Sequence, residues 1–254
     1  RIDFVFLGAG LPIKGIPVED LRTAGVKVIP IVSSARAAVL IFKSWSKKYK
    51  DIPDAVVVEG PKAGGHLGFK MEQIDDPDFA LERILPGVVA EIKTFEDKYQ
   101  RTIPVIAAGG VYTGDDIYKV FKLGASGVQM GTRFVATEEC DASEEFKQAY
   151  VDATEEDIQI IKSPVGMPGR SIFNGFLQEA SDGQRRPAVC KSNCLKSCNP
   201  KTTLYCISDA LLSAFKGNLK DGFAFVGANA GRIHRISTVK EVFDELQEEY
   251  RVAE

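Results

Sequence analysis

Short apolar runs alternate with helical patterns over the first half of the chain. The runs cover residues 2–7, 26–32, 54–58, 103–107 and 127–130. They are continuous and are bounded by Gly, Pro or polar residues, which is typical of strands buried on both faces of a parallel sheet. Between the runs, apolar residues such as Ile84, Val88 and Ile92 follow helical spacing. Residues 1 to about 135 are therefore predicted to form an α/β fold of five strands joined by helices.

Five strand–helix units are compatible with two architectures. Crossovers between parallel strands are right-handed, so both architectures lay the strands side by side with helices packed on the sheet. A closed (β/α)8 barrel needs eight strands and about 250 residues. The pattern predicts either an open five-stranded sheet or the last five strands of a barrel whose first three are absent from the chain.

The second half of the chain has a different character. A polar-faced helix is predicted over 144–161, an irregular connector rich in Pro and Gly over 163–170, and a helix over 208–215. A final amphipathic helix begins at a capping box formed by Thr238 and Glu241. The predicted segments are 1–137 (the strand–helix units), 138–221 (mostly helical, with a cysteine-rich stretch) and 222–254 (a Gly-rich segment and the terminal helix).

Composition argues against several classes of protein. The 254 residues include 32 Lys and Arg against 35 Asp and Glu, a net charge of −3, whereas nucleic-acid binders usually have a clearly basic face. No apolar run approaches the ~20 residues of a membrane helix, and no targeting signal is visible. We therefore expect a cytoplasmic protein without nucleic-acid or membrane partners. Because the chain opens on Arg1 and not on Met, we also expect it to be cut at its N-terminus.

The segment EGPKAGGHLG, residues 59–68, directly follows a predicted strand. The C-terminal ends of parallel strands are where α/β active sites form. Glycines around His66 would let the backbone approach a planar ligand, and the imidazole would accept a proton near neutral pH. The alternative is a Gly-rich loop with an ordinary hydrogen-bonded histidine. The other histidine, His234, is expected to be a surface or packing residue.

Two further strand-to-loop junctions are rich in glycine. Gly109 and Gly110 end one run, and Gly131 and Thr132 end the next. The loops after the last two strands of a barrel often bind phosphate through backbone N–H groups. The pair of junctions therefore predicts a phosphorylated cofactor or substrate, with tight turns between strand and helix as the alternative.

Three blocks, EGPKAGGHLG, IPVIAAGGV and GASGVQMGTRFVAT, resemble the signature blocks of the nitronate monooxygenase (2-nitropropane dioxygenase) family, which includes the flavin-dependent enoyl-acyl-carrier-protein reductases. The resemblance extends from residue 1 to about 140 and continues more weakly beyond. It implies an FMN-binding TIM (β/α)8 barrel with a smaller, mostly helical C-terminal domain. In that fold the five runs are the last five strands, so the first three βα units are expected to be absent.

The resemblance also implies roles for individual residues. His66 takes the position of the catalytic base, which removes a proton from the carbon beside a nitro group, and FMN performs the redox step. Residues at FMN-contacting positions of the family are Gly64, Gly65, Gly109, Gly110, Gln129, Met130, Gly131, Thr132, Gly227 and Asn229. Lys62 departs from the family, since many relatives have an acidic residue there. Its charge would favour an anionic substrate or an NADPH phosphate, and the alternative is a solvated loop lysine.

The resulting functional prediction is FMN-dependent oxidation of nitronates or nitroalkanes with O2. The alternative on the same scaffold is reduction of an enoyl thioester by NAD(P)H. A third possibility, from another class, is a flavin-binding or electron-transfer module without turnover. A base such as His66 argues against the third, because flavin binding alone needs no base. The sequence does not decide whether the protein forms a homodimer.

Five cysteines complete the candidate chemistry. Cys140 is isolated in the sequence, whereas Cys190, Cys194, Cys198 and Cys206 are clustered. A disulfide framework is not expected in a chain of this size without an export signal. The spacing does not match a standard zinc pattern. We expect no metal and free thiols, with an iron–sulfur cluster or zinc as the alternative.

Overall fold

The computed structural model describes residues 2–8, 10–185, 190, 194 and 198–254. The chain folds as two compact units, which we call the sheet unit and the hairpin unit. The sheet unit comprises residues 1–62, 68–130 and 246–254, and the hairpin unit comprises residues 63–67 and 131–245.

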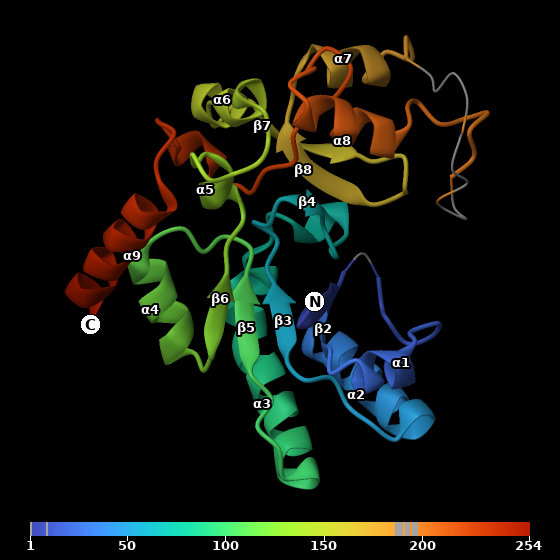
Figure 1. Ribbon diagram of the computed structural model, residues 1–254, viewed down its shortest axis with the longest axis vertical. Helices are drawn as coiled ribbons and strands as arrows, with labels where there is room; N and C mark the ends of the chain where they lie inside the picture. Colours follow the sequence, from blue (N-terminus) through green and yellow to red (C-terminus); the bar gives the residue numbers. More distant parts are fainter. Residues whose placement is uncertain (1, 9, 186–189, 191–193, 195–197) are drawn as a thin grey trace. The chain divides into compact units, whose positions relative to one another are not determined.

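The sheet unit is built on five parallel strands (Figure 1). They are β1 (Phe4–Leu7), β2 (Lys27–Val32), β3 (Val56–Glu59), β5 (Val105–Ala108) and β6 (Gly127–Gln129). Their order in the sheet is β1-β2-β3-β5-β6. All five runs predicted from the sequence are confirmed as strands, and the α/β class with a parallel sheet is confirmed with them.

The strand order never reverses along the chain. Each strand is followed in the sheet by the next one of this set, in one direction, whereas a doubly wound sheet has a point where the order turns back. With right-handed crossovers, such an order keeps every connecting helix on the same face. The connecting helices are α1 (Val18–Thr23), α2 (Ala35–Tyr49), α3 (Leu81–Tyr99) and α4 (Gly114–Lys122). Two 3₁₀ turns, η1 (Met71–Gln73) and η2 (Pro77–Phe79), precede α3.

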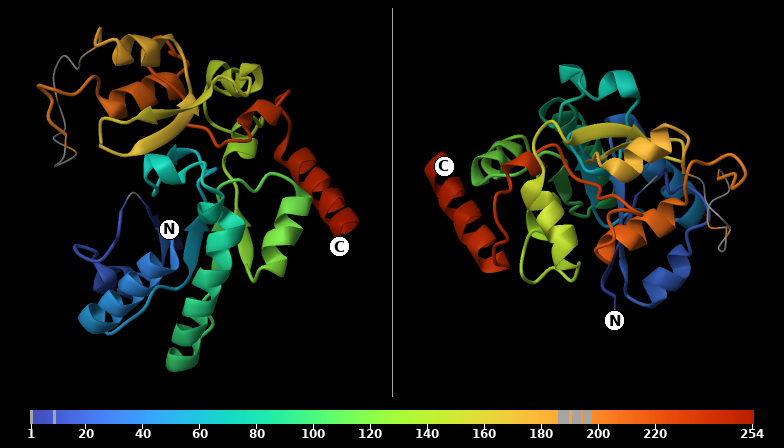
Figure 2. Two further views of the ribbon diagram at one scale, coloured as in Figure 1. Left: turned by 180° about the vertical axis from the view of Figure 1, so that it is seen from behind. Right: turned by 90° about the horizontal axis from the view of Figure 1, so that it is seen from above.

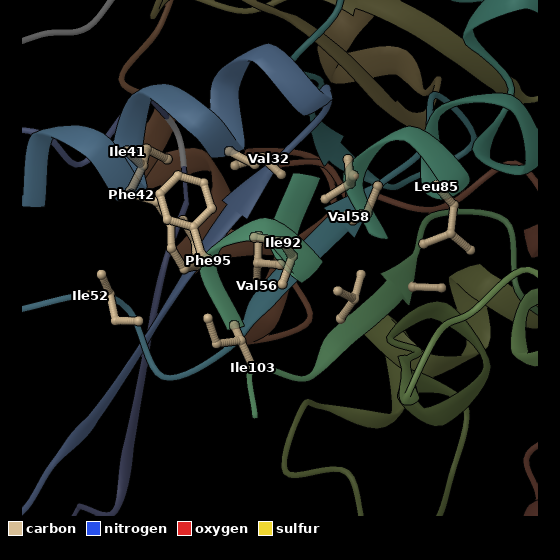
Figure 3. Close-up of a cluster of buried hydrophobic side chains, with 14 of the residues drawn as sticks. Val32, Ile41, Phe42, Ile52, Val56, Val58, Leu85, Ile92, Phe95 and Ile103 are labelled. Carbon is tan, nitrogen blue, oxygen red and sulfur yellow. The ribbon is translucent and has the colours of Figure 1, made fainter. Parts of the chain in front are cut away.

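Side chains of the sheet alternate between two buried faces. Val56 and Val58 belong to the core under the helices, together with Phe42 of α2 and Phe95 of α3, whose rings are 5.0 Å apart (Figure 3). Val57 points to the opposite face, where it packs with Ile29, Ala55 and Ala108. The central strands β2, β3 and β5 are largely buried on both faces, so most of their residues are apolar, which explains the continuous runs in the sequence.

The hairpin unit contains a three-stranded antiparallel sheet in the order β4-β8-β7. Its strands are β4 (Gly65–His66), β7 (Ile158–Lys162) and β8 (Pro168–Ile172). Its helices are α5 (Thr132–Val135), α6 (Glu144–Asp152), α7 (Gly175–Ser181) and α8 (Ile207–Phe215), followed by the 3₁₀ turn η3 (Ala230–Arg232). Helices α7 and α8 lie side by side (Figures 1 and 2), and their apolar faces share a core with Phe223.

Two sequence predictions for this unit are wrong. Helix α6 ends at Asp152, so the helix expected to reach residue 161 gives way to strand β7. The expected irregular connector over 163–170 is instead the turn of a β-hairpin and the first residues of its second strand, β8. A local turn explains the early end of the helix, because the Asp157 carboxylate accepts hydrogen bonds from both the backbone N–H and the hydroxyl of Thr154.

The two units also differ from the three segments 1–137, 138–221 and 222–254 expected from the sequence. Residues 63–67 join the hairpin unit because β4 pairs with β8, about a hundred positions later. The last residues return to the sheet unit, where the carboxylate of Glu249 accepts a hydrogen bond of 2.7 Å from the N–H of Gly114. A hydrophobic pattern reports local elements, not the distant strand or helix with which an element pairs.

The terminal helix α9 (Val239–Ala253) confirms the predicted amphipathic helix and its capping box. The Thr238 N–H donates to the Glu241 carboxylate at 2.7 Å, and the Glu241 N–H donates to the Thr238 hydroxyl at 3.1 Å. None of the helices in the described part of the chain is long and apolar enough to cross a membrane.

Candidate functional site

His66 is the last residue of the two-residue strand β4, which forms the edge of the hairpin-unit sheet. It pairs with Gly169 of β8, and the next residue, Leu67, donates its N–H to the carbonyl of Pro168 at 2.9 Å. A Cβ atom at Gly169 would lie 2.9 Å from the Phe225 ring and 3.3 Å from the carbonyl oxygen of Gly65. Glycine at position 169 is therefore what allows β4 to pair here.

Among the residues that the structure describes, the imidazole of His66 has a close polar partner in the hydroxyl of Ser163, directly after β7. The distance from Nε2 to the serine Oγ is 2.6 Å, and Ser163 is only 3% exposed. The Phe225 ring packs edge-on against the imidazole at 5.0 Å between centroids. Burial lowers the pKa of His66 below 6.5, because the charged form loses water. The imidazole is therefore neutral at physiological pH and able to accept a proton.

Arg170 of β8 fixes the start of the glycine-rich strand. Its buried guanidinium donates from Nη1 to the carbonyl oxygen of Ala63 at 2.9 Å. Ala63 comes directly before Gly64 and Gly65, so this contact restrains the backbone that precedes His66. Neither Arg170 nor Ser163 was predicted from the sequence. The Pro and Gly residues of the stretch 163–170 are a hairpin signal, and reading them as one would have placed both residues beside the strand of His66.

Gly64 and Gly65 have opposite surroundings. A Cβ atom at Gly64 would lie 2.5 Å from the carbonyl carbon of Val226 and 2.7 Å from the nitrogen of Gly227, so two backbone segments meet here without room for a side chain. At Gly65 the φ angle is +75° and no atom lies within 4 Å of a Cβ position. One glycine therefore allows a close backbone approach, while the other leaves space beside His66.

The predicted residues Thr132 and Gly227 are joined by a hydrogen bond. The Gly227 N–H donates to the Thr132 hydroxyl at 2.8 Å. The Cβ position of Gly131 has no atom within 4 Å, so the start of α5 is open beside this hydroxyl. Asn229 follows two residues after Gly227 and is half-buried. The structure thus brings the late Gly-rich segment to both Gly64 and Thr132.

In the sheet unit, the predicted glycines 109 and 110 form a turn directly after β5. Both have positive φ angles, +81° and +110°, which glycine adopts without strain. Gln129 ends β6 opposite Ala108, is exposed, and shares the face of the sheet away from the helices. Met130 instead packs against the core under the helices. Of these two predicted residues, Gln129 is the one on the helix-free face.

Glu59 ends β3 and was not predicted as a site residue. It lies opposite Ala108 in the sheet, and alternation along β3 directs it to the same face as Val57. Burial raises the pKa of its carboxyl from 4.5 to about 7. The residue follows three valines without exposed surface, and a charged residue that ends such an apolar run is the signal that would have identified it.

The cysteines and His234 lie outside this arrangement. Cys140, Cys190, Cys194, Cys198 and Cys206 are all free thiols. Among the residues that the structure describes, no three His, Cys, Asp or Glu residues are placed to hold a metal ion, so the iron–sulfur and zinc alternatives gain no support. Several residues between the clustered cysteines lie outside the described residues. His234 is exposed, as expected for a surface residue.

The chain is similar in sequence to proteins of one known family. A family model described as nitronate monooxygenase matches residues 1–249. A probable nitronate monooxygenase of Staphylococcus aureus strain JH9 is 33% identical over 173 residues, which are 68% of this chain and 44% of the relative. The match therefore spans less than half of that curated relative.

Two solved structures share the fold. FabK from Thermotoga maritima superposes with a TM-score of 0.72 and 29% identity, over 98% of this chain and 68% of FabK. A nitroalkane oxidase from Streptomyces ansochromogenes superposes with a TM-score of 0.64 and 24% identity, over 93% of this chain and 60% of the oxidase. At that identity, the second likeness shows the fold alone.

Proposed function

The chain belongs to the nitronate monooxygenase family, and we propose that it acts in an FMN-dependent oxidoreductase that oxidises nitronates or nitroalkanes with O2. The observation that supports this proposal most is the neutral, half-buried His66, held by Ser163 beside the open position of Gly65. A base of this kind suits the removal of a proton from carbon and is superfluous in a passive flavin-binding module.

We infer that the five parallel strands are an arc of a (β/α)8 barrel, with the hairpin unit as the smaller domain. The unreversed strand order and the helices on a single face are what a barrel requires. The superposition with FabK over 98% of this chain supports the same inference.

The residues fit an FMN cofactor. The positive-φ pair Gly109 and Gly110, in the sheet unit, is a turn of the kind that binds phosphate. In the hairpin unit, Gly131 leaves space beside the Thr132 hydroxyl, which accepts from Gly227 and keeps its own proton to donate. FMN, when bound, supplies the redox chemistry.

In this proposal His66 accepts the proton and Ser163 orients the imidazole. When Nε2–H donates to the Ser163 hydroxyl, Nδ1 keeps the lone pair that takes the proton from the carbon beside the nitro group. Packing of the ring against Phe225 and its contact with Ser163 fix the direction of that lone pair. A nitronate is already an anion, so its oxidation does not need this step.

A second candidate function is NAD(P)H-dependent reduction of an enoyl thioester. The specific observation in its favour is the likeness to FabK, an enoyl-acyl-carrier-protein reductase, which exceeds the likeness to the nitroalkane oxidase in both identity and TM-score. The two functions differ in the electron donor, which is the nitro compound in the first and a nicotinamide nucleotide in the second.

Anaerobic mixing of the FMN-loaded protein separates the two functions. The visible flavin band is followed after addition of a small alkyl nitronate or, separately, of NADPH. The proposal expects rapid bleaching by the nitronate and not by NADPH. Bleaching by NADPH that an enoyl thioester reverses would replace the proposal with the reductase.

A further inference from the structure

Lys62 lies along the glycine turn after β5, within the sheet unit. A Cβ atom placed on Gly110 would be 3.0 Å from the Cβ of Lys62, 3.3 Å from its Cδ and 3.6 Å from its Cγ. The aliphatic stem of the lysine therefore covers Gly110, and only a residue without a side chain leaves room for it. Lys62 is the third residue after the end of β3, so the loop that leads to His66 brings the stem to this turn.

The charge of Lys62 is not neutralised within the described part of the chain. No ion pair or hydrogen bond of its ammonium group is found there, and the residue is exposed. Some of the other cations of the sheet unit are paired, such as Lys93 with Glu96 at 3.3 Å and Lys119 with Asp115 at 2.5 Å. A stem packed on a glycine turn with an unpaired ammonium group places a positive charge at the edge of that turn.

A glycine turn with a lysine at its edge favours an anionic ligand. Consecutive positive-φ glycines form concave backbone turns that bind anions, and lysine contributes to phosphate sites as a point charge. An acidic side chain at position 62 would repel a dianion at this place. Exchange of a negative for a positive charge changes the preference of the turn without changing its backbone.

We propose that Lys62 is a specificity-determining residue that binds a phosphate monoester dianion over the Gly109–Gly110 turn, and that this dianion is the 5′-phosphate of FMN. The proposal rests on the proposed function. It assigns to this chain a cationic contribution to cofactor selectivity. Lys62 should therefore favour FMN over riboflavin, which has the same ring system and no phosphate.

The test is flavin binding, measured by quenching of flavin fluorescence on titration of the protein freed of flavin. Lys62→Ala is expected to weaken FMN binding about 10-fold, as for loss of a charge-assisted contact, and Lys62→Glu to weaken it further. Riboflavin binding should change less than about twofold in both variants, because it lacks the phosphate. Lys62→Arg should retain FMN binding close to that of the wild type.

Lys70→Ala is the matched control, because Lys70 is a lysine of the same unit that is 75% exposed and pairs with Glu72 at 3.7 Å. It changes the net charge equally and should leave both flavin affinities unchanged. The dependence of FMN affinity on KCl concentration should also be weaker in Lys62→Ala than in Lys70→Ala.

Several results would overturn the proposal. Unchanged FMN binding in Lys62→Ala, or an equal loss of FMN and riboflavin binding, contradicts a phosphate contact while the proposed function stands. Unchanged FMN binding combined with a selective loss of NADPH over NADH binding would reassign the phosphate to the nicotinamide nucleotide. Failure of the wild-type protein to bind either flavin would contradict the proposed function as well.

Discussion

The sheet unit and the hairpin unit contribute different chemistry. The sheet unit offers backbone turns at the ends of buried strands, and the turn of Gly109 and Gly110 after β5 is its main candidate for binding a phosphate. The hairpin unit offers side chains held by tertiary contacts, with His66 fixed by Ser163 and Phe225. The sheet unit thus presents backbone turns at strand ends, whereas the hairpin unit presents an imidazole on a small antiparallel sheet whose edge is the two-residue strand β4.

The largest expected effect concerns the packing of Gly64, directly before β4. Gly64→Ala would place a Cβ atom 2.5 Å from the backbone of Val226, so we expect a loss of about 3 kcal/mol or more in the free energy of unfolding. Gly65→Ala is the matched control. Its Cβ atom meets open space, and only the φ angle of +75° opposes it, at a cost of about 1–2 kcal/mol. Urea unfolding measures both, and equal losses would contradict the close backbone approach at Gly64.

A second prediction concerns the sheet unit and pH. Burial raises the pKa of Glu59 from 4.5 to about 7, so the folded protein binds more protons than the unfolded chain between these values. The free energy of unfolding therefore falls as pH rises from 4.5 to 7, by about 3 kcal/mol from this group at most. Glu59→Gln should abolish that part of the pH dependence.

Urea unfolding at pH 5 and pH 8 measures this effect. The control is Glu72→Gln, which makes the same substitution at a side chain that is 71% exposed. The same pH dependence in Glu59→Gln and in the wild type would show that the Glu59 carboxyl is not the group that titrates.

A third prediction returns to the hairpin unit. Ser163→Ala removes the hydroxyl 2.6 Å from Nε2 of His66, so we expect kcat/KM for a neutral nitroalkane to fall about 10-fold, with a smaller change for the nitronate. Its pH profile should also shift, since a partner of the base is lost. Ser171→Ala is the control, because Ser171 is fully buried and its hydroxyl has no hydrogen-bond partner among the described residues.

The smallest expected effect concerns the pH at which kcat/KM begins to fall on the acid side of its pH profile. Because burial lowers the pKa of His66, the neutral base persists below pH 6.5. The kcat/KM for a neutral nitroalkane should therefore decline only at pH values below 6.5. A decline centred above pH 6.5 would mean that the imidazole is not desolvated in the active protein.

The sequence predicted the sheet unit well and the hairpin unit poorly, for a physical reason. Strands such as β3 are buried on both faces, so their valines form a continuous run that is visible locally. Strand β4 has two residues, and its existence depends on Gly169 and the turn before it, far along the chain. Motif resemblance located His66 and the glycines, but it did not identify Ser163, because that contact forms only when the hairpin folds.

The most direct test of the account is the selectivity of a His66→Gln variant for two forms of one substrate. The kcat/KM values are measured for a neutral nitroalkane and for its nitronate, with FMN content and thermal unfolding checked in both proteins. The account predicts a loss of about 10²–10⁴-fold for the nitroalkane and a far smaller loss for the nitronate, since only the first requires a base. Equal losses for both substrates, or no loss for the nitroalkane, would contradict the assignment of His66 as the base.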